Sequence, residues 1–231
     1  VEIWKKMNTW ALNGWKETYK TFDIKHDKEY YESEIYNKGK KIILKGAEKG
    51  IFEKLPDGSI KVDLEKEGLG EKYLLRGDGT TLYITQDIYL AELKKQDFNF
   101  TKSYYIVGNE QDYHFKVLFN VLGKLGFDLR GLKHISYGMV ELPEGKMKSR
   151  EGTVVDADVL IQSVQSLVKK ELSKREKFSK TELEKRSLII ALAAIKFMLL
   201  KIDIKRNRVF NPKESIAFEG DTGPYLLYSY A

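Results

Sequence analysis

The residues of this chain that could do chemistry fall into three short groups, and the most charged group is the stretch 145–155. It places Lys146, Lys148 and Arg150 within five residues. Pro143 stands just before it and breaks any regular element, so the pattern predicts a flexible cationic loop. Such a loop can fold over a polyphosphate and neutralise charge as a phosphate group leaves. A solvated basic turn is the alternative that the spacing leaves open.

The second group is the pair Tyr83 and Asp87. Thr85 has the side chain of a good N-cap, which predicts a helix from Gln86 to about Lys95. Tyr83 and Asp87 would then stand on either side of a strand-to-helix junction, where α/β folds place ligand contacts. A carboxylate beside a phenol can receive the fork of a guanidinium group. A capping role for Asp87 in the first helical turn explains the same residues equally well.

The third group is polar and follows an apolar strand that is predicted over 103–108. Gln111, Asp112 and His114 begin the helix that comes after this strand. Strands and helices alternate through 81–155, which predicts a parallel sheet in a doubly wound α/β domain. The loops after neighbouring parallel strands open at the same edge of the sheet, so we expect the three groups to form one site.

The elements that precede this α/β region follow from periodicity. Residues 1–22 repeat large apolar side chains every three to four positions, which predicts an amphipathic helix whose aromatic side chains belong to the core. Residues 51–85 show the alternation of strands around a turn signal at 56–59. The stretches 72–76 and 81–85 are predicted to form a hairpin-like pair.

The composition is that of a soluble globular protein. The chain has 231 residues, of which 42% are hydrophobic and 32% charged, and this is enough for one large or two modest domains. It has no cysteine, which excludes disulfides and Cys-based zinc sites, and its three histidines stand far apart, so we expect no metal site. The N-terminal residues do not resemble a signal peptide and no apolar run could span a membrane, so we expect a cytoplasmic protein.

Positive charge is concentrated in the helices that are predicted after Asp156. The whole chain carries a formal net charge of +6, whereas residues 161–210 alone hold 13 Lys/Arg and 5 Asp/Glu, a balance of +8. Such a block suits the phosphate backbone of a nucleic acid. Solvated helix faces account for the same pattern.

Four segments, in order along the chain, resemble arginyl-tRNA synthetases. The basic loop, Lys-Met-Lys-Ser-Arg-Glu-Gly at 146–152, resembles the KMSKS signature of class I aminoacyl-tRNA synthetases. Lys148 stands where serine is usual and Ser149 where the second lysine is usual. The other three segments are Leu-Tyr-Ile-Thr-Gln-Asp-Ile at 82–88, Tyr-Ile-Val-Gly-Asn-Glu-Gln-Asp-Tyr-His-Phe at 105–115 and Phe-Glu-Gly-Asp-Thr-Gly-Pro-Tyr-Leu at 218–226.

The resemblance implies the Rossmann-like, doubly wound parallel sheet of class I synthetases, here its second half, followed by an α-helical stem-contact region. By similarity, arginine binding falls to Tyr83, Asp87 and Gln111. Binding of ATP would involve residues from all three groups and the strand before the loop. They are Gly108, Glu110, His114, Met139, Val140, Met147 and Ser149.

The reaction that the resemblance implies is ATP-dependent activation of arginine to arginyl-adenylate and transfer to tRNA-Arg. Lys146 and Lys148, with Arg150 third, would be the catalytic residues and would close on the pyrophosphate. Mg²⁺ would accompany ATP and be held mainly by phosphates, with no tightly bound cofactor and no protein metal site. The basic helices within 157–210 would contact the tRNA, and no membrane partner is implied.

The chain also departs from the family pattern. It contains no HIGH-type motif, such as His-x-Gly-His, and Gln86 stands where an arginine is expected. We therefore expect a fragment that is inactive alone and lacks the N-terminal half of the catalytic domain. Residues 1–156 would be part of the catalytic domain, with its loop at 145–152, and 157–231 the stem-contact region that leads to an anticodon-binding domain. A non-catalytic RNA- or protein-binding paralogue and an unrelated nucleotide-binding α/β protein are the alternatives.

Overall fold

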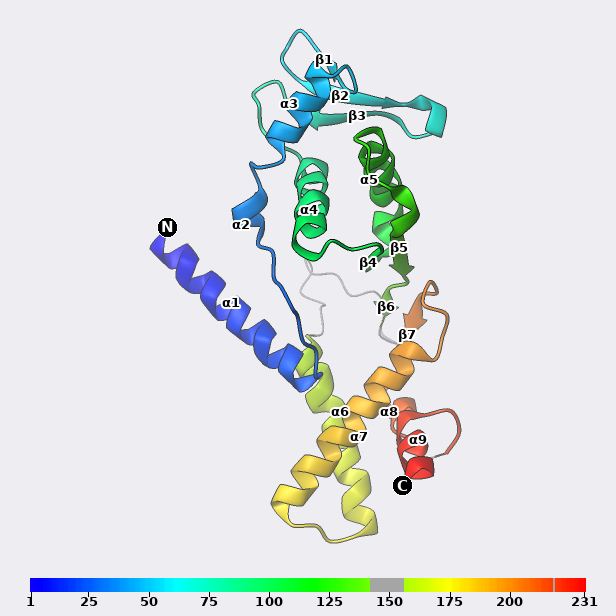
Figure 1. The fold of residues 1–231 in the computed structure, drawn as a ribbon. Helices are drawn as coiled ribbons and strands as arrows, with labels where there is room; N and C mark the ends of the chain where they lie inside the picture. The colour runs from blue at the N-terminus through cyan, green and yellow to red at the C-terminus, as the bar shows by residue number, and fades with distance from the viewer. Residues whose placement is uncertain (142–155, 218) are drawn as a thin grey trace. The chain divides into compact units, whose positions relative to one another are not determined.

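The structure, a computed structural model, divides the chain into two compact units. The helical unit combines Val1–Asp27 with Gly138–Ala231, and the α/β unit is the continuous stretch Lys28–Tyr137. Figure 1 shows the elements of both units. The ranges that the structure describes are 1–141, 156–217 and 219–231.

The α/β unit contains two small sheets and the helices that pack on them. Strands β1, β2 and β3 form an antiparallel sheet in that order, and β4 and β5 form a parallel pair. The elements of this unit are α2 (Glu32–Ile35), α3 (Lys40–Glu48), β1 (Glu53–Lys54), β2 (Ile60–Leu64), η1 (Glu65–Glu67), β3 (Gly70–Leu75), α4 (Tyr83–Phe98), β4 (Ser103–Gly108), η2 (Asn109–Gln111), α5 (Asp112–Lys124), η3 (Leu129–Gly131) and β5 (Leu132–Tyr137).

The antiparallel sheet follows from alternation in the sequence. Ile60, Val62 and Leu64 of β2 are buried, as the two-residue period of a strand dictates. In the turn before β2, Asp57 accepts hydrogen bonds from the backbone N–H of Ser59 at 2.9 Å and from its hydroxyl at 2.6 Å. The predicted turn and the strand after it are therefore confirmed.

The parallel pair β4 and β5 is joined through α5. The two strands pair in register over their full length, which confirms the predicted parallel arrangement for these strands. Leu118 and Leu122 of α5 are fully buried in the core of this unit. A Cβ at Gly131 would lie 2.2 Å from the carbonyl oxygen of Thr101, so glycine is needed where β5 begins.

The helical unit is built around the long helices α6 and α7, which pack against each other, and α9 packs on α7. Strands β6 and β7 form a short parallel pair. The elements of this unit are α1 (Glu2–Thr21), β6 (Val140–Glu141), α6 (Ala157–Arg175), α7 (Lys180–Leu200), β7 (Arg208–Val209), α8 (Pro212–Ser215) and α9 (Gly223–Tyr230).

Small buried residues set the spacing of these helices. Ala191 and Ala194 of α7 are fully buried together with Val164 of α6. A Cβ at Gly223 would lie 2.2 Å from the carbonyl oxygen of Ala193, so glycine lets α9 start directly against α7. Within the described ranges, no helix combines the length and the apolar character needed to cross a membrane.

Helix α4 starts earlier than the sequence predicts. Tyr83 is its first residue and Leu82, in an extended conformation, is its N-cap. Thr85 lies fully buried inside the first turn, where its hydroxyl donates to the carbonyl oxygen of Leu74 in β3. The predicted strand over 81–85 is wrong, because only its first residue bridges to β3. The Thr85 hydroxyl bonds to the neighbouring strand and does not cap the helix.

Helix α1 presents its aromatic face to solvent. The predicted helix is confirmed, but Trp4, Trp10 and Trp15 are 60%, 61% and 58% exposed, and no residue of the helix is buried. The prediction that its aromatic side chains belong to the core is therefore wrong. Amphipathic spacing shows which side of a helix is apolar, and does not show what covers that side. The C-terminal end of α1 is tied to α6, since the Thr18 hydroxyl lies 3.0 and 2.9 Å from the two carboxylate oxygens of Asp158.

The exposure of α1 predicts a specific fluorescence signal. All three tryptophans of the chain lie in this helix, so tryptophan fluorescence, excited at a wavelength that tyrosine does not absorb, reports on α1 alone. We expect emission at the wavelength of water-exposed indole and quenching by acrylamide at nearly the rate found for a free tryptophan derivative, which is the control. Blue-shifted emission that acrylamide barely quenches would contradict the exposed helix.

The core of the α/β unit predicts a contrast between two leucines. Leu118→Ala removes a fully buried side chain and is expected to lower the free energy of unfolding by about 2–5 kcal/mol. Leu129→Ala, the matched control, removes a side chain that is 41% exposed. It should change the free energy of unfolding by about 0.5 kcal/mol or less. Urea unfolding followed by far-ultraviolet circular dichroism measures both. Equal losses in the two variants would refute this assignment of the core.

Candidate functional site

The residues predicted to bind arginine on α4 lie on one face of its first two turns. Tyr83 is the first residue of the helix and Asp87 stands four residues later, so their side chains are neighbours on the helix surface. Tyr83 is 76% exposed and Asp87 is half-buried. Thr85, between them, holds the helix start against β3 through its hydroxyl. Both side chains therefore belong to one anchored helix rather than to the two sides of a junction.

One contact joins a predicted arginine-binding residue to a predicted ATP-binding residue. Nε2 of His114, in the first turn of α5, lies 2.7 Å from Oδ2 of Asp87. The imidazole N–H donates to the carboxylate, which is a charge-assisted hydrogen bond. Both side chains are partly exposed, at 26% for His114 and 36% for Asp87, so the pair lies at an accessible surface. The sequence assigns these residues to different ligands, and the structure brings them together.

The turn after β4 carries the other predicted residues of the α/β unit. Strand β4 ends at Gly108, the short helix η2 spans Asn109–Gln111, and α5 follows directly. Glu110 and Gln111 are exposed, and Gly108 pairs with the last residue of β5. Gly108, Glu110, Gln111 and His114 therefore follow the carboxyl edge of the parallel pair, where α/β proteins bind ligands.

His134 belongs to the same region and is absent from the residues that the sequence singles out. Its Nε2 lies 3.0 Å from the carbonyl oxygen of Val107, and its Nδ1 lies 3.5 Å from Oδ1 of Asp112. Its ring stacks on Phe115 with centroids 4.3 Å apart, and the ring of His114 lies nearly perpendicular to the same phenyl ring with centroids 5.5 Å apart. The parallel register of β4 and β5 thus gathers two histidines that are far apart in sequence.

Lys94 and Tyr105 complete the surroundings of Asp87. The Nζ of Lys94 lies 3.7 Å from the centroid of the Tyr105 ring, a cation–π contact. Burial lowers the pKa of Lys94 to about 8, and attraction to Asp87 acts in the opposite direction. Burial also raises the pKa of Tyr105, and the charge of Asp87 adds to the rise. The spacing of seven residues between Asp87 and Lys94, two helical turns, is the sequence signal that could have indicated Lys94.

The remaining predicted residues belong to the helical unit or lie outside the described ranges. The backbone N–H of Met139 donates to Oδ1 of Asn207 at 2.8 Å, and its carbonyl accepts from the backbone N–H of Arg208 at 3.0 Å. Val140 begins β6, which pairs with β7. Their predicted contact with adenine stays a prediction. Outside the described residues lie Lys146, Met147, Lys148, Ser149 and Arg150.

With this geometry established, comparison with known proteins identifies the family. The family model of the tRNA synthetases class I (R), catalytic domain, matches residues 1–212. The chain belongs to this family. Strand β4, the turn after it and the first turns of α4 and α5 are therefore elements of a class I synthetase catalytic domain.

Curated relatives of this synthetase chain are similar over its whole length. The arginine–tRNA ligase of Phocaeicola vulgatus is 52% identical over 233 residues, which cover 99% of the chain and 38% of the relative. The arginine–tRNA ligase of Porphyromonas gingivalis is 48% identical over 235 residues, which cover 100% of the chain and 39% of the relative. The chain thus spans about two fifths of the length of these relatives.

Solved structures confirm the fold class. The arginyl-tRNA synthetase of Plasmodium falciparum superposes with a TM-score of 0.81 over 99% of this synthetase chain and 39% of its own, at 22% identity. The arginyl-tRNA synthetase of Thermus thermophilus gives 0.79 over 93% of this chain and 42% of its own, at 20% identity. The predicted mixed α/β fold with parallel strand pairing is the class I synthetase fold.

The position of Lys94 predicts a measurable titration. NMR of the side-chain ¹³Cε resonances should show Lys94 titrating with a pKa of about 8. The resonance of the exposed Lys102 serves as the control. Asp87→Asn should move the pKa of Lys94 further down, because the carboxylate favours its charged form. An unchanged or raised value in Asp87→Asn would contradict the proximity of the two groups.

The same shift predicts how stability depends on pH. The pKa of Lys94 is about 8 in the folded chain, which is lower than its ordinary value of 10.5. At a pH between these two values, the unfolded chain therefore binds more protons than the folded chain. The contribution of Lys94 to the free energy of unfolding therefore rises from pH 8 to 10.5 and is at its least favourable below pH 8. Lys94→Met should flatten this rise in urea unfolding, and Lys102→Met should not. Identical pH profiles for the two variants would count against the partial burial of Lys94.

Proposed function

We propose that this chain forms part of an arginine–tRNA ligase, which activates arginine with ATP to arginyl-adenylate and transfers it to tRNA-Arg. The observation that carries the proposal is the partly exposed Asp87 carboxylate, beside Tyr83 and paired with His114, in a chain of this family. Arginine–tRNA ligases that are 48–52% identical over the whole chain support it.

Asp87 would select the guanidinium group of arginine. A carboxylate matches the planar fork of a guanidinium with two parallel hydrogen bonds, which an ammonium group cannot reproduce. His114 engages Oδ2 of Asp87, so the substrate would bind the other oxygen or take the place of the imidazole. Tyr83, four residues earlier on the same face, offers an exposed ring and hydroxyl to the arginine stem. Gln111 would help to hold the amino acid.

The turn after β4, the segment at 139–140 and the basic loop would each contribute residues to ATP binding. Gly108, Glu110 and His114 would line the ribose and phosphates, and Met139 and Val140 would offer backbone groups to adenine. In the same proposal, Met147 and Ser149 would also bind ATP. Catalysis would rest on positioning and on the charges of three loop cations that close on the pyrophosphate. The loop cations are Lys146, Lys148 and Arg150.

Magnesium would enter as part of the ATP substrate. Among the described residues, no three His, Asp or Glu side chains lie together in a way that could hold a metal ion. The chemistry of Mg²⁺ favours phosphate oxygens and water in such a site, so the ion would be held mainly by ATP.

The partners of the whole protein are part of the proposal. Residues 1–156 would form part of the catalytic domain, and 157–231 the region that contacts tRNA and leads to an anticodon-binding domain. The exposed aromatic face of α1 fits a position against the N-terminal half of that domain. The basic helices within 157–210 would meet the RNA backbone, in a cytoplasmic protein.

The test of the proposed activity is arginine-dependent ATP–pyrophosphate exchange, with and without tRNA-Arg. This chain alone is expected to be inactive, and exchange should appear when the upstream half of the catalytic domain is supplied as a separate polypeptide. Exchange that needs arginine supports the ligase. Continued inactivity with the upstream half and tRNA present would favour a non-catalytic RNA- or protein-binding paralogue.

A matched pair of aspartates on α4 tests the role of Asp87. Asp87→Asn is expected to raise the KM for arginine at least about 100-fold in the reconstituted enzyme, since it removes one partner of a charge pair. Asp97→Asn is the control. Asp97 lies on the same helix as Asp87, and its carboxylate already binds Lys28 at 2.5 Å and Tyr30 at 2.6 Å. An unchanged KM in Asp87→Asn would instead favour a nucleotide-binding protein with no preference for arginine.

A further inference from the structure

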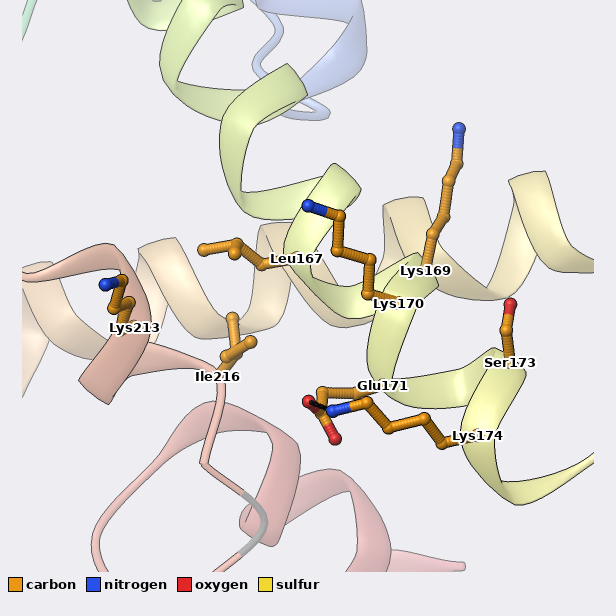
Figure 2. Close-up of a pocket in the computed structure, with 8 residues that line it drawn as sticks. All are labelled: Leu167, Lys169, Lys170, Glu171, Ser173, Lys174, Lys213 and Ile216. Atoms are coloured by element: carbon orange, nitrogen blue, oxygen red, sulfur yellow. Dashed lines mark hydrogen bonds and ion pairs between the residues drawn. The ribbon is translucent and has the colours of Figure 1, made fainter.

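The helical unit has a cavity of about 690 Å³ between α6 and α8 (Figure 2). Lys170 and Lys174, which line it, are exposed and belong to the basic helices that are already proposed to meet RNA. The cavity therefore adds no separate site. The α/β unit, in contrast, holds a nearly buried polar side chain that has no role in the proposed chemistry. It is His134 of β5, whose side chain is 10% exposed.

Both ring nitrogens of His134 face acceptors on other elements. Nε2 lies 3.0 Å from the carbonyl oxygen of Val107, one residue before the end of β4. A carbonyl oxygen can only accept, so Nε2 carries a hydrogen and donates it. Nδ1 lies 3.5 Å from Oδ1 of Asp112, the first residue of α5. One rigid ring thus reaches from the end of a strand to the start of the helix that follows it.

The turn between those two contacts carries Gly108, Glu110 and Gln111, which the proposed function assigns to ATP and arginine. The turn is short, and the backbone N–H of Asp112 closes it by donating to the carbonyl of Asn109. A buried histidine needs hydrogen-bond partners of some kind, and here both partners are the ends of one turn. A turn whose two ends are tied to the same side chain has little freedom to move.

The ring of His134 also supports the pair formed by Asp87 and His114. It stacks on Phe115 with centroids 4.3 Å apart, and the centroid of the His114 ring lies 5.5 Å from that of the same phenyl ring. Phe115 is buried, and in a close-packed interior the displacement of one ring is felt by its neighbours. His114 in turn lies 2.7 Å from Asp87. The contacts of His134 therefore extend to the predicted arginine-binding carboxylate through two rings.

We propose that His134 is a positioning residue, which fixes the turn after β4 in the conformation that binds ATP and arginine. Its imidazole holds the end of β4 through Val107 and the start of α5 through Asp112, and the substrates contact the residues in between. His134 itself touches neither substrate. The identity of the substrates rests on the proposed ligase function, whereas the fixed turn is a property of this chain alone.

Amide hydrogen exchange of this chain, measured by NMR without ligands, tests whether the imidazole fixes the turn. His134→Phe keeps a ring on Phe115 and removes both nitrogens, so the N–H of Asp112 should exchange roughly three- to tenfold faster, as expected for one lost hydrogen bond. The reference is the N–H of Phe127, which bonds to the carbonyl of Leu122 at the other end of α5 and should keep its rate. Equal acceleration of both amides would indicate a general loss of packing and would overturn the proposal, as would an unchanged rate at Asp112.

Two amide substitutions separate the two contacts of the ring. The side chain of glutamine places its N–H₂ group near the position of Nε2 and can still donate to Val107, whereas asparagine reaches only as far as Nδ1. We expect His134→Gln to restore most of the protection at Asp112 and His134→Asn to restore less, because the contact of Nε2 is the shorter one. In the unmodified chain, long-range ¹H–¹⁵N spectra should show the hydrogen on Nε2. A bare Nε2, or better protection in His134→Asn than in His134→Gln, would contradict the bond to Val107.

In the enzyme reconstituted with the upstream half of the catalytic domain, the same variants test the link to substrate binding. His134→Phe should raise the KM for both ATP and arginine roughly three- to tenfold and leave kcat within about twofold, since the turn binds the substrates and does not react with them. His134→Gln should recover most of this loss. His26→Phe is the matched control, because it removes an exposed imidazole of the helical unit.

The positioning role and the ligase function fail separately in these experiments. A lowered kcat with unchanged KM values in His134→Phe would overturn the positioning role. Absence of arginine-dependent exchange in the unmodified reconstituted enzyme would remove the ligase function, and the fixed turn would then be decided by the hydrogen exchange of Asp112 alone.

Discussion

The candidate site depends on holding the Asp87 carboxylate beside basic groups while it is partly removed from water. A half-buried carboxylate in that position is stabilised by hydrogen-bond donors or positive charges that face it. His114 supplies the donor from the start of α5, and Lys94 supplies charge from two turns further along α4. The first turns of α4 and α5 must therefore stay next to each other. Packing of Ile88 and Leu118 in one core keeps them there.

The two helix starts are positioned by contacts that are distant in sequence. For α4, the Thr85 hydroxyl bonds to the Leu74 carbonyl of β3, and this displaces the helix start to Tyr83. A threonine before an apolar run ordinarily predicts an N-cap, and that local preference is weaker than the buried contact. For α5, the end of β4 at Gly108 sets the start, because β4 is paired in register with β5. Neither constraint can be deduced from local sequence.

Local patterns and family motifs nevertheless predicted much of the fold. The parallel pairing of β4 and β5, the turn at Asp57 and the long helices after Asp156 are all present. The motifs indicated Asp87 and His114, and spacing could not show that the two residues bond to each other. His134 and Tyr105 were missed because their partners depend on strand register. The aromatic face of α1 was assigned to the core because periodicity does not show what covers an apolar face.

Under the proposed function, the Asp87 carboxylate determines the selectivity for arginine over lysine. With His114 bound at Oδ2, an incoming side chain must offer Asp87 more than the imidazole already does. A guanidinium meets this demand, because it donates two parallel hydrogen bonds and keeps its charge when desolvated. An ammonium group donates to one oxygen at a time and loses more hydration on entry, so it gains less from the exchange. Displacing the imidazole would cost both cations the same free energy, so the discrimination comes from the fit of the guanidinium fork to the carboxylate, and the His114 contact serves to hold that carboxylate in position.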